Sequence, residues 1–179
     1  MVKAMVVGTH IGTVDLLQRR VGGILKDIAK VDVCWFEDLD KTDADIYISY
    51  AHGMRFPLIK EKFKNTDKKV IGAELTILPV GVRMLNAVPK GQKMGVVAEH
   101  LRCANYFLSE IIRTGVLDYK FSAGPISAMK DMDVDVYAIP EELIGLVKKG
   151  DNRGKSLIQI PRTITPMCAA ELINAALEV

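Results

Sequence analysis

Short apolar runs alternate with longer amphipathic segments along the whole of the 179-residue chain. Each run is short and rich in β-branched residues, which is typical of a buried strand. The segments between the runs carry apolar residues at helical spacing, as over residues 13–28,. Strands that alternate with helices form parallel sheets joined by crossover helices. The sequence therefore predicts an α/β fold, with one or more mostly parallel sheets and helices on both faces.

The boundaries of the elements follow from the same patterns. We expect strands over residues 3–8, 31–36, 45–50, 69–74, 93–98, 119–122, 134–139 and 156–160. We expect helices over residues 13–28, 56–64, 79–88, 101–113, 141–149 and 165–177, with a helical turn over residues 126–131. Thr13 and Thr165 are the predicted N-caps, because a threonine hydroxyl accepts hydrogen bonds from the first free amides of a helix.

The length is compatible with a single α/β domain over residues 1–179,. Gly91 lies near the middle of the chain, and each half begins with a strand of similar composition. No stretch repeats by identity. Two Rossmann-like lobes, residues 1–90 and 91–179, are therefore an alternative to one continuous sheet.

Composition excludes several classes of protein. Hydrophobic residues make up 49% of the chain, and 24 Lys and Arg nearly balance 22 Asp and Glu, which excludes intrinsic disorder,. The net charge of +2 argues against a dedicated nucleic-acid binder,. No apolar run reaches the roughly 20 residues of a membrane helix. The three cysteines form no CxxC pair, which favours reduced thiols in a cytoplasmic protein,.

Polar side chains collect directly after the predicted strands, where open α/β sheets bind ligands. The only three histidines of the chain lie in these segments, together with arginines and hydroxyls that include Thr9. Arginine recognises carboxylate and phosphate, and helix N-termini add backbone donors. We therefore expect a site for a small anionic or polyhydroxylated metabolite on one rim. Its candidate residues are His10, Thr13, His52, Arg55, Glu74, Thr76, His100, Arg102, Arg162 and Thr163.

Motifs of better-defined chemistry are missing from the sequence. Residues 8–12 have a GxxxG spacing and not the GxGxxG of dinucleotide sites, and no P-loop or GxSxG elbow occurs,. The histidine spacings of 42 and 48 residues match no zinc motif,. Cys103 lies at a predicted helix start, which can lower a thiol pKa, but no base partner is evident. The sequence therefore predicts no cofactor, no metal and no catalytic residue.

The run from Ala44 to Phe107 resembles the amino-terminal effector-sensing domain of propionate-catabolism transcription activators. The resemblance rests on DADIYISY leading into Ala51-His52-Gly53, then on KKVIGAEL and QKMGVVAEH. The last third, VDVYAIPEELIGLVKKG and SLIQIPRTITPMCAAEL, is similar to the ends of ligand-sensing domains in winged-helix regulators. The usual Arg-Gly-Gly loop of the first family is replaced by His52-Gly53, so its ligand does not carry over.

This resemblance implies a cytoplasmic, dimeric metabolite sensor that contacts DNA only through a module not visible in this chain. A small enzyme is the alternative, such as an isomerase or racemase of the aspartate/glutamate type. Those enzymes resemble one another in a facing pair of cysteines after strands, and here only Cys103 lies in such a loop. A third possibility is a subunit that binds no ligand and uses its apolar helices for assembly. The leading expectation is the metabolite-binding module, with the small enzyme kept as its alternative.

Overall fold

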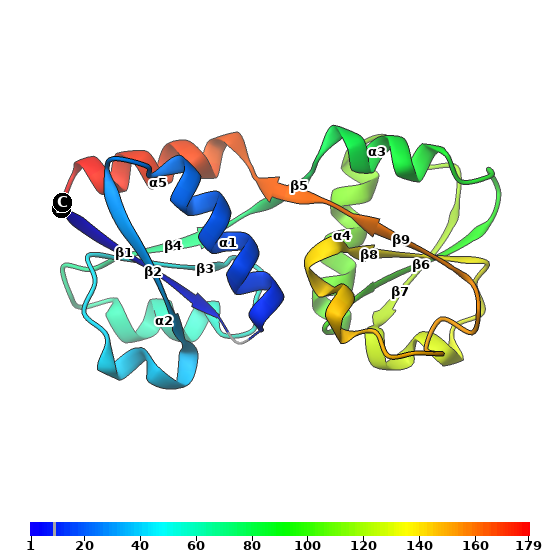
Figure 1. Cartoon of the computed structure of the whole chain (residues 1–179), viewed down its shortest axis with the longest axis horizontal. Coiled ribbons are helices and arrows are strands. Elements are labelled where there is room, and N and C mark those ends of the chain that lie inside the picture. The colour runs from blue at the N-terminus through cyan, green and yellow to red at the C-terminus, as the bar shows by residue number, and fades with distance from the viewer. Residues whose placement is uncertain (9) are drawn as a thin grey trace. The chain divides into compact units, whose positions relative to one another are not determined.

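The computed structural model describes residues 1–8 and 10–179, which form two compact units. The first unit contains Met1–Leu75 and Thr163–Val179, and the second contains Thr76–Arg162. Each unit is built on a four-stranded parallel sheet flanked by helices (Figure 1). The predicted α/β fold is therefore confirmed, in the form of two Rossmann-like lobes. No described helix combines the length and apolar character needed to cross a membrane.

The sheet of the first unit has the strand order β2-β1-β3-β4. Its strands are β1 (Val2–Gly8), β2 (Ala29–Trp35), β3 (Ile46–Tyr50) and β4 (Lys69–Ala73). One face is covered by α1 and α5, and the other by α2 and a 3-10 segment, η1 (Figure 1). These are α1 (Ile11–Ile24), η1 (Phe36–Lys41), α2 (Phe56–Phe63) and α5 (Pro166–Leu177).

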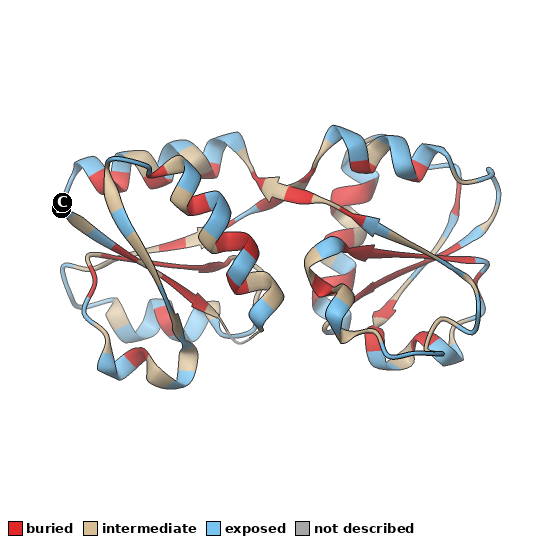
Figure 2. Ribbon diagram, viewed as in Figure 1, coloured by how far each residue is buried: buried red, intermediate tan, exposed pale blue. Residues whose placement is uncertain are grey.

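The central strands of this unit are the most buried (Figure 2). All five residues of β3 are buried, because the strand has a neighbour on each side and helices on both faces,. Below the sheet, the Tyr47 ring stacks on Phe63 with a centroid separation of 4.2 Å. Val7, Leu39 and Ile59 complete this cluster.

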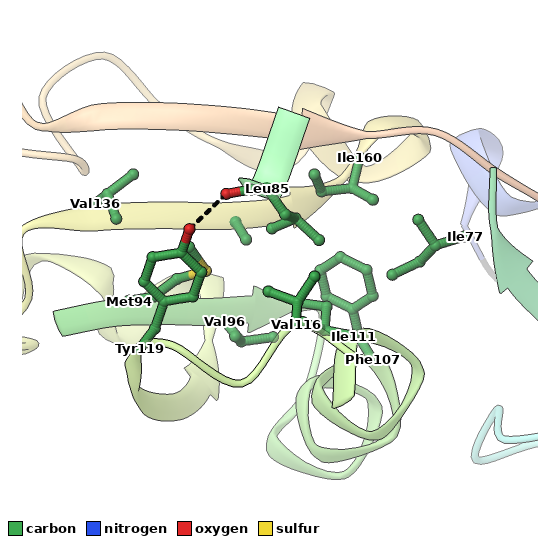
Figure 3. Close-up of a cluster of buried hydrophobic side chains, with 11 residues drawn as sticks. Ile77, Leu85, Met94, Val96, Phe107, Ile111, Val116, Tyr119, Val136 and Ile160 are labelled. Atoms are coloured by element: carbon green, nitrogen blue, oxygen red, sulfur yellow. Dashed lines mark hydrogen bonds between the residues drawn. The ribbon is translucent and has the colours of Figure 1, made fainter. Parts of the chain in front are cut away.

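The sheet of the second unit has the corresponding order β7-β6-β8-β9. Its strands are β6 (Lys93–Ala98), β7 (Lys120–Pro125), β8 (Val136–Pro140) and β9 (Ser156–Ile160). The helical elements are α3 (Pro79–Asn86), α4 (Leu101–Arg113) and two 3-10 segments, η2 (Ile126–Asp131) and η3 (Glu141–Leu146). The main core lies between the sheet and the helices α3 and α4 (Figure 3). Within it, the Tyr119 hydroxyl lies 2.7 Å from the Leu85 carbonyl oxygen.

The two units repeat one another with a shift of 90 residues. The Lys3 amide donates to the Asp45 carboxylate at 2.8 Å, and the Lys93 amide donates to Asp135 at 2.8 Å (93 − 3 = 90 and 135 − 45 = 90). Strand registers follow the same shift, pairing Lys3 with Lys30 and Lys93 with Lys120, and Ala4 with Ile46 and Met94 with Val136. The repeat is one of topology and register, since no stretch repeats by identity.

The chain passes between the units in two short strands, β5 (Leu75–Ile77) and β10 (Arg162–Ile164), which pair with each other. The helix that follows each of these two strands packs on the sheet of the unit that the chain has just entered. Thus α3 contacts β9, and α5 contacts β4. The unit boundaries therefore fall in β5 and β10 and not at residue 90.

Several expected elements differ in the structure. The first helix begins at Ile11 with His10 as its N-cap, so the prediction of Thr13 as N-cap is wrong. Thr165 is confirmed as a cap, because its hydroxyl accepts from the Cys168 amide at 3.2 Å. The helix predicted over residues 141–149 is instead the 3-10 segment η3, within a stretch that contains Gly145 and ends at Gly150,.

Candidate functional site

Each sheet has a topological switch point at its centre. In the order β2-β1-β3-β4, the connections from β1 and β3 leave toward opposite edges, and ligands of such sheets bind beyond the carboxyl ends of these two strands,. His10 follows β1 and His52 follows β3. In the second unit His100 follows β6 and Glu142 follows β8. Both switch points therefore carry titratable side chains.

The predicted site residues are divided between two sheets and do not share one rim. A single rim follows only if all strands form one parallel sheet, whereas the chain builds two such sheets, as in the alternative of two lobes. The first unit holds His10, Thr13, His52, Arg55, Glu74 and Thr163, and the second holds Thr76, His100, Arg102 and Arg162. Thr9 lies outside the described residues.

In the first unit, the switch-point side chains are half-buried. His10 is the N-cap of α1 through its backbone, and its carbonyl accepts from Val14 at 3.0 Å. Its Nδ1 is buried without a hydrogen-bond partner in the described part of the chain. The His52 ring meets Tyr50 edge-on, with centroids 5.7 Å apart. Arg55 is exposed, and its guanidinium lies 5.0 Å from the Phe36 ring centroid.

Three other candidates belong to the crossing segments. Thr76 lies in β5 and Thr163 in β10, so neither stands in a loop after a strand, as had been predicted. Glu74 is exposed, and its carbonyl accepts from the Thr165 amide at 3.0 Å. These short strands were missed because three residues are too few to show a period of two.

At the start of α4, the second unit presents exposed polar groups. His100 is the backbone N-cap, and its Nε2 lies 3.5 Å from Glu99 Oε1. The exposed Arg102 guanidinium lies 5.7 Å from the Tyr106 ring centroid. A shallow hollow of about 440 Å³ runs along this face of the helix, lined by Leu101, Arg102, Asn105, Tyr106 and Ser109.

Arg162 has a different environment from the one predicted. It was expected to meet an anionic ligand, but its side chain is only 3% exposed and binds two carboxylates. Its Nη1 donates to both Glu110 oxygens, at 3.1 and 3.2 Å, and its Nε donates to Glu142 Oε1 at 3.1 Å. Nη2 also donates to Glu142 Oε1. Its guanidinium carbon lies 5.5 Å from the Phe107 ring centroid.

The second carboxylate oxygen of Glu142 stands out in this triad of Glu110, Arg162 and Glu142. The Glu142 side chain is 3% exposed, yet its Oε2 has no hydrogen-bond partner among the residues that the structure describes. A buried polar atom left in this way costs about 1–3 kcal/mol. The second unit therefore holds a buried hydrogen-bond acceptor, Glu142 Oε2, for which the described residues provide no donor.

Sequence reasoning missed both glutamates. A usable signal existed for Glu110, which lies on the apolar stripe of α4 with Cys103 and Phe107, where a carboxylate needs a buried partner,. Glu142 gives no such signal, because an acidic residue early in a helical segment is ordinarily explained by the helix dipole.

Burial raises the pKa of Glu110 above its ordinary value, although Arg162 opposes this effect. The folded chain therefore holds this proton more tightly than the unfolded chain. The resulting stabilisation is present at low pH and is lost as the pH rises from the unfolded pKa of about 4.3 through the folded one.

We predict that Glu110→Gln removes this pH-dependent loss of stability. The difference between wild-type and variant unfolding free energies, from urea titrations across this window, measures it. If the difference between the two unfolding free energies stayed constant across this pH window, the prediction would be wrong. Glu141→Gln, on exposed Glu141, is the control.

The cysteines give the enzyme alternative no support. Burial is the main cause that raises the pKa of the Cys103 and Cys168 thiols, which keeps them protonated. Thr13 stands at the position of the first unit that corresponds to Cys103 (103 − 90 = 13). Cys168 lies in α5, where its Sγ is 3.7 Å from the Gly72 carbonyl oxygen. Among the described residues, no cluster of three or more His, Cys, Asp or Glu side chains is placed to hold a metal ion.

Searches of protein-family models, curated proteins and solved structures found nothing that matches this chain.

Proposed function

We propose that this chain is the effector-sensing domain of a bacterial-type transcription regulator, and that it binds a small polar metabolite. The observation that carries the proposal is the pair of switch points, each bordered by polar side chains at the carboxyl ends of parallel strands,. The resemblance in the sequence supports the sensory role. In this proposal, DNA contact belongs to an attached or partner module, and the sensor acts as a homodimer.

The contacts of the arginines narrow the ligand chemistry. Arg162 already has two carboxylate partners, so an anionic group would have to displace one of them. Arg55 and Arg102 are exposed and remain the candidates for an anionic part of the ligand,. A polyhydroxylated ligand would use the same rims through carboxylate and histidine acceptors.

Signalling in this proposal follows from differential affinity. A metabolite that binds one conformation of the domain more tightly than another shifts the population toward the first. The effect is limited by the ratio of the two affinities, so a ligand without that preference would stabilise the domain and send no signal.

A thermal-shift screen tests the binding proposal. Ligands that bind only the folded chain raise the melting temperature by mass action. The panel contains phosphate, ribose 5-phosphate, propionate, citrate, ribose, sorbitol, glycine and putrescine. We expect a saturable rise with at least one compound. Arg55→Ala and Arg102→Ala should weaken the response to anions, while Arg83→Ala, on the exposed Arg83 of α3, should not. No response to any compound would refute the proposal.

A further inference from the structure

The triad of Glu110, Arg162 and Glu142 holds more negative than positive charge. Two carboxylates and one guanidinium give −2 + 1 = −1 when all three are ionised, and the three side chains are 3–5% exposed. Buried charges are ordinarily paired, because an uncompensated one is strongly destabilising. With both carboxylates ionised, the triad by itself therefore lacks one positive charge.

The shared fold does not require this triad. The corresponding residues of the first unit are Arg20 (110 − 90), His52 (142 − 90) and Leu75, which begins β5 as Arg162 begins β10. The first unit therefore has the same strand order and register without this set of charges. A feature present in only one of two matching lobes is not explained by the architecture.

The triad also lies where ligands of such sheets bind. Glu142 follows β8, one of the two strands at the switch point, and Arg162 follows the neighbouring strand β9. Glu110 lies one turn beyond Tyr106 on α4, and Tyr106 lines the hollow along that helix,. Glu142 Oε2 is itself buried, so a ligand reaches it only if η3 moves, and the 3-10 hydrogen bonds of η3 have poorer geometry than those of an α-helix,.

We propose that Glu142 Oε2 is the binding point for an ammonium group of the ligand. This inference rests on the proposed function and names its substrate class: a small metabolite with a primary or secondary amine. An ammonium group supplies the missing donor and the missing positive charge together. A hydroxyl group would supply the donor and leave the charge uncompensated, and a purely anionic ligand would add to the repulsion.

The test compares the full-length chain with Glu142→Gln and Glu141→Gln. Both substitutions remove one negative charge from η3 and keep the shape of the side chain, but only Glu142 contacts Arg162. The probes are glycine, putrescine and ethanolamine, with sorbitol, phosphate and propionate for comparison, and calorimetric titration gives the affinity. We expect an amine to bind the wild type and Glu141→Gln equally. Binding to Glu142→Gln should be about 10- to 100-fold weaker, the range for a hydrogen bond to a charged group.

A second measurement needs no variant. Glycine and its trimethylated form, betaine, carry the same charge, but betaine has no N–H to donate. We expect betaine to bind at least about 10-fold more weakly than glycine if glycine is the amine that binds, and putrescine with a trimethylammonium group at each end to behave likewise against putrescine. This comparison keeps the proposal testable if Glu142→Gln does not fold.

The outcomes separate the two proposals. Binding of phosphate, propionate or sorbitol without binding of any amine would overturn the ammonium subsite and leave the sensor proposal standing. Equal amine binding by Glu142→Gln and wild type, or equal binding of methylated and unmethylated amines, would overturn the subsite alone. No binding of any probe would overturn both proposals.

Discussion

Replacement of Arg162 by methionine is expected to lower the free energy of unfolding by about 3–5 kcal/mol. The guanidinium is the only cation that the described structure places in hydrogen-bond contact with Glu110 and Glu142. Methionine fills much of the same volume but provides no donor. Two carboxylates would then remain buried without compensation, and burial already raises the pKa of Glu110 with the arginine present.

Urea unfolding followed by far-UV circular dichroism measures this loss. Arg83→Met is the matched control, because Arg83 is exposed on α3, and we expect it to change stability by no more than about 0.5 kcal/mol,. Adding Glu110→Gln and Glu142→Gln to Arg162→Met should restore part of the loss, since the stranded charges are then gone. A loss below about 1 kcal/mol for Arg162→Met, or no rescue by the two glutamines, would show that the triad does not hold buried charge.

Arg162 also shows where sequence reasoning stops. Its position after a predicted strand indicated the carboxyl end of a sheet correctly, because an apolar run followed by polar residues marks the end of a buried strand. The partners of Arg162 lie 52 and 20 residues away along the chain, and neither spacing belongs to a local pattern. Contacts between residues so far apart in the sequence decide whether an arginine binds a ligand or neutralises buried carboxylates of its own chain.

The eight longer strands of the described structure and most helices could be predicted because their period and length are local properties, whereas β5 and β10 are too short to show either. The repeat could not, since equivalent positions conserve burial more than identity: Leu17 of α1 corresponds to Phe107 of α4, and both are buried. The sequence also did not indicate that α3 packs on the sheet of the second unit and α5 on the sheet of the first. Their sequences predict helices correctly, but the sheet that each helix covers depends on where β5 and β10 direct the chain.

Phe107→Ala is predicted to cost about 3–5 kcal/mol of unfolding free energy. Phe107 is fully buried in the core between α4 and the sheet of the second unit (Figure 3). Truncation removes the apolar contacts of the ring and leaves a cavity that β6 and β8 are too constrained to fill. It also removes the aromatic face beside the Arg162 guanidinium, so the loss combines packing with a cation–π contact,.

Phe107→Leu separates these two contributions. Leucine is the residue at the corresponding buried position of the first unit, Leu17 on α1, so the same architecture packs a leucine there. It keeps most of the packed volume and lacks the aromatic face, and we expect a loss of about 1–2 kcal/mol of unfolding free energy.

Asn105→Ala, on the exposed Asn105 of α4, controls for changes in the helix itself. Urea unfolding of the three variants gives the order directly. If Phe107→Leu costs as much as Phe107→Ala, the aromatic contact to Arg162 outweighs the cavity. If Phe107→Ala costs less than about 1.5 kcal/mol, the core of the second unit is looser than its burial indicates.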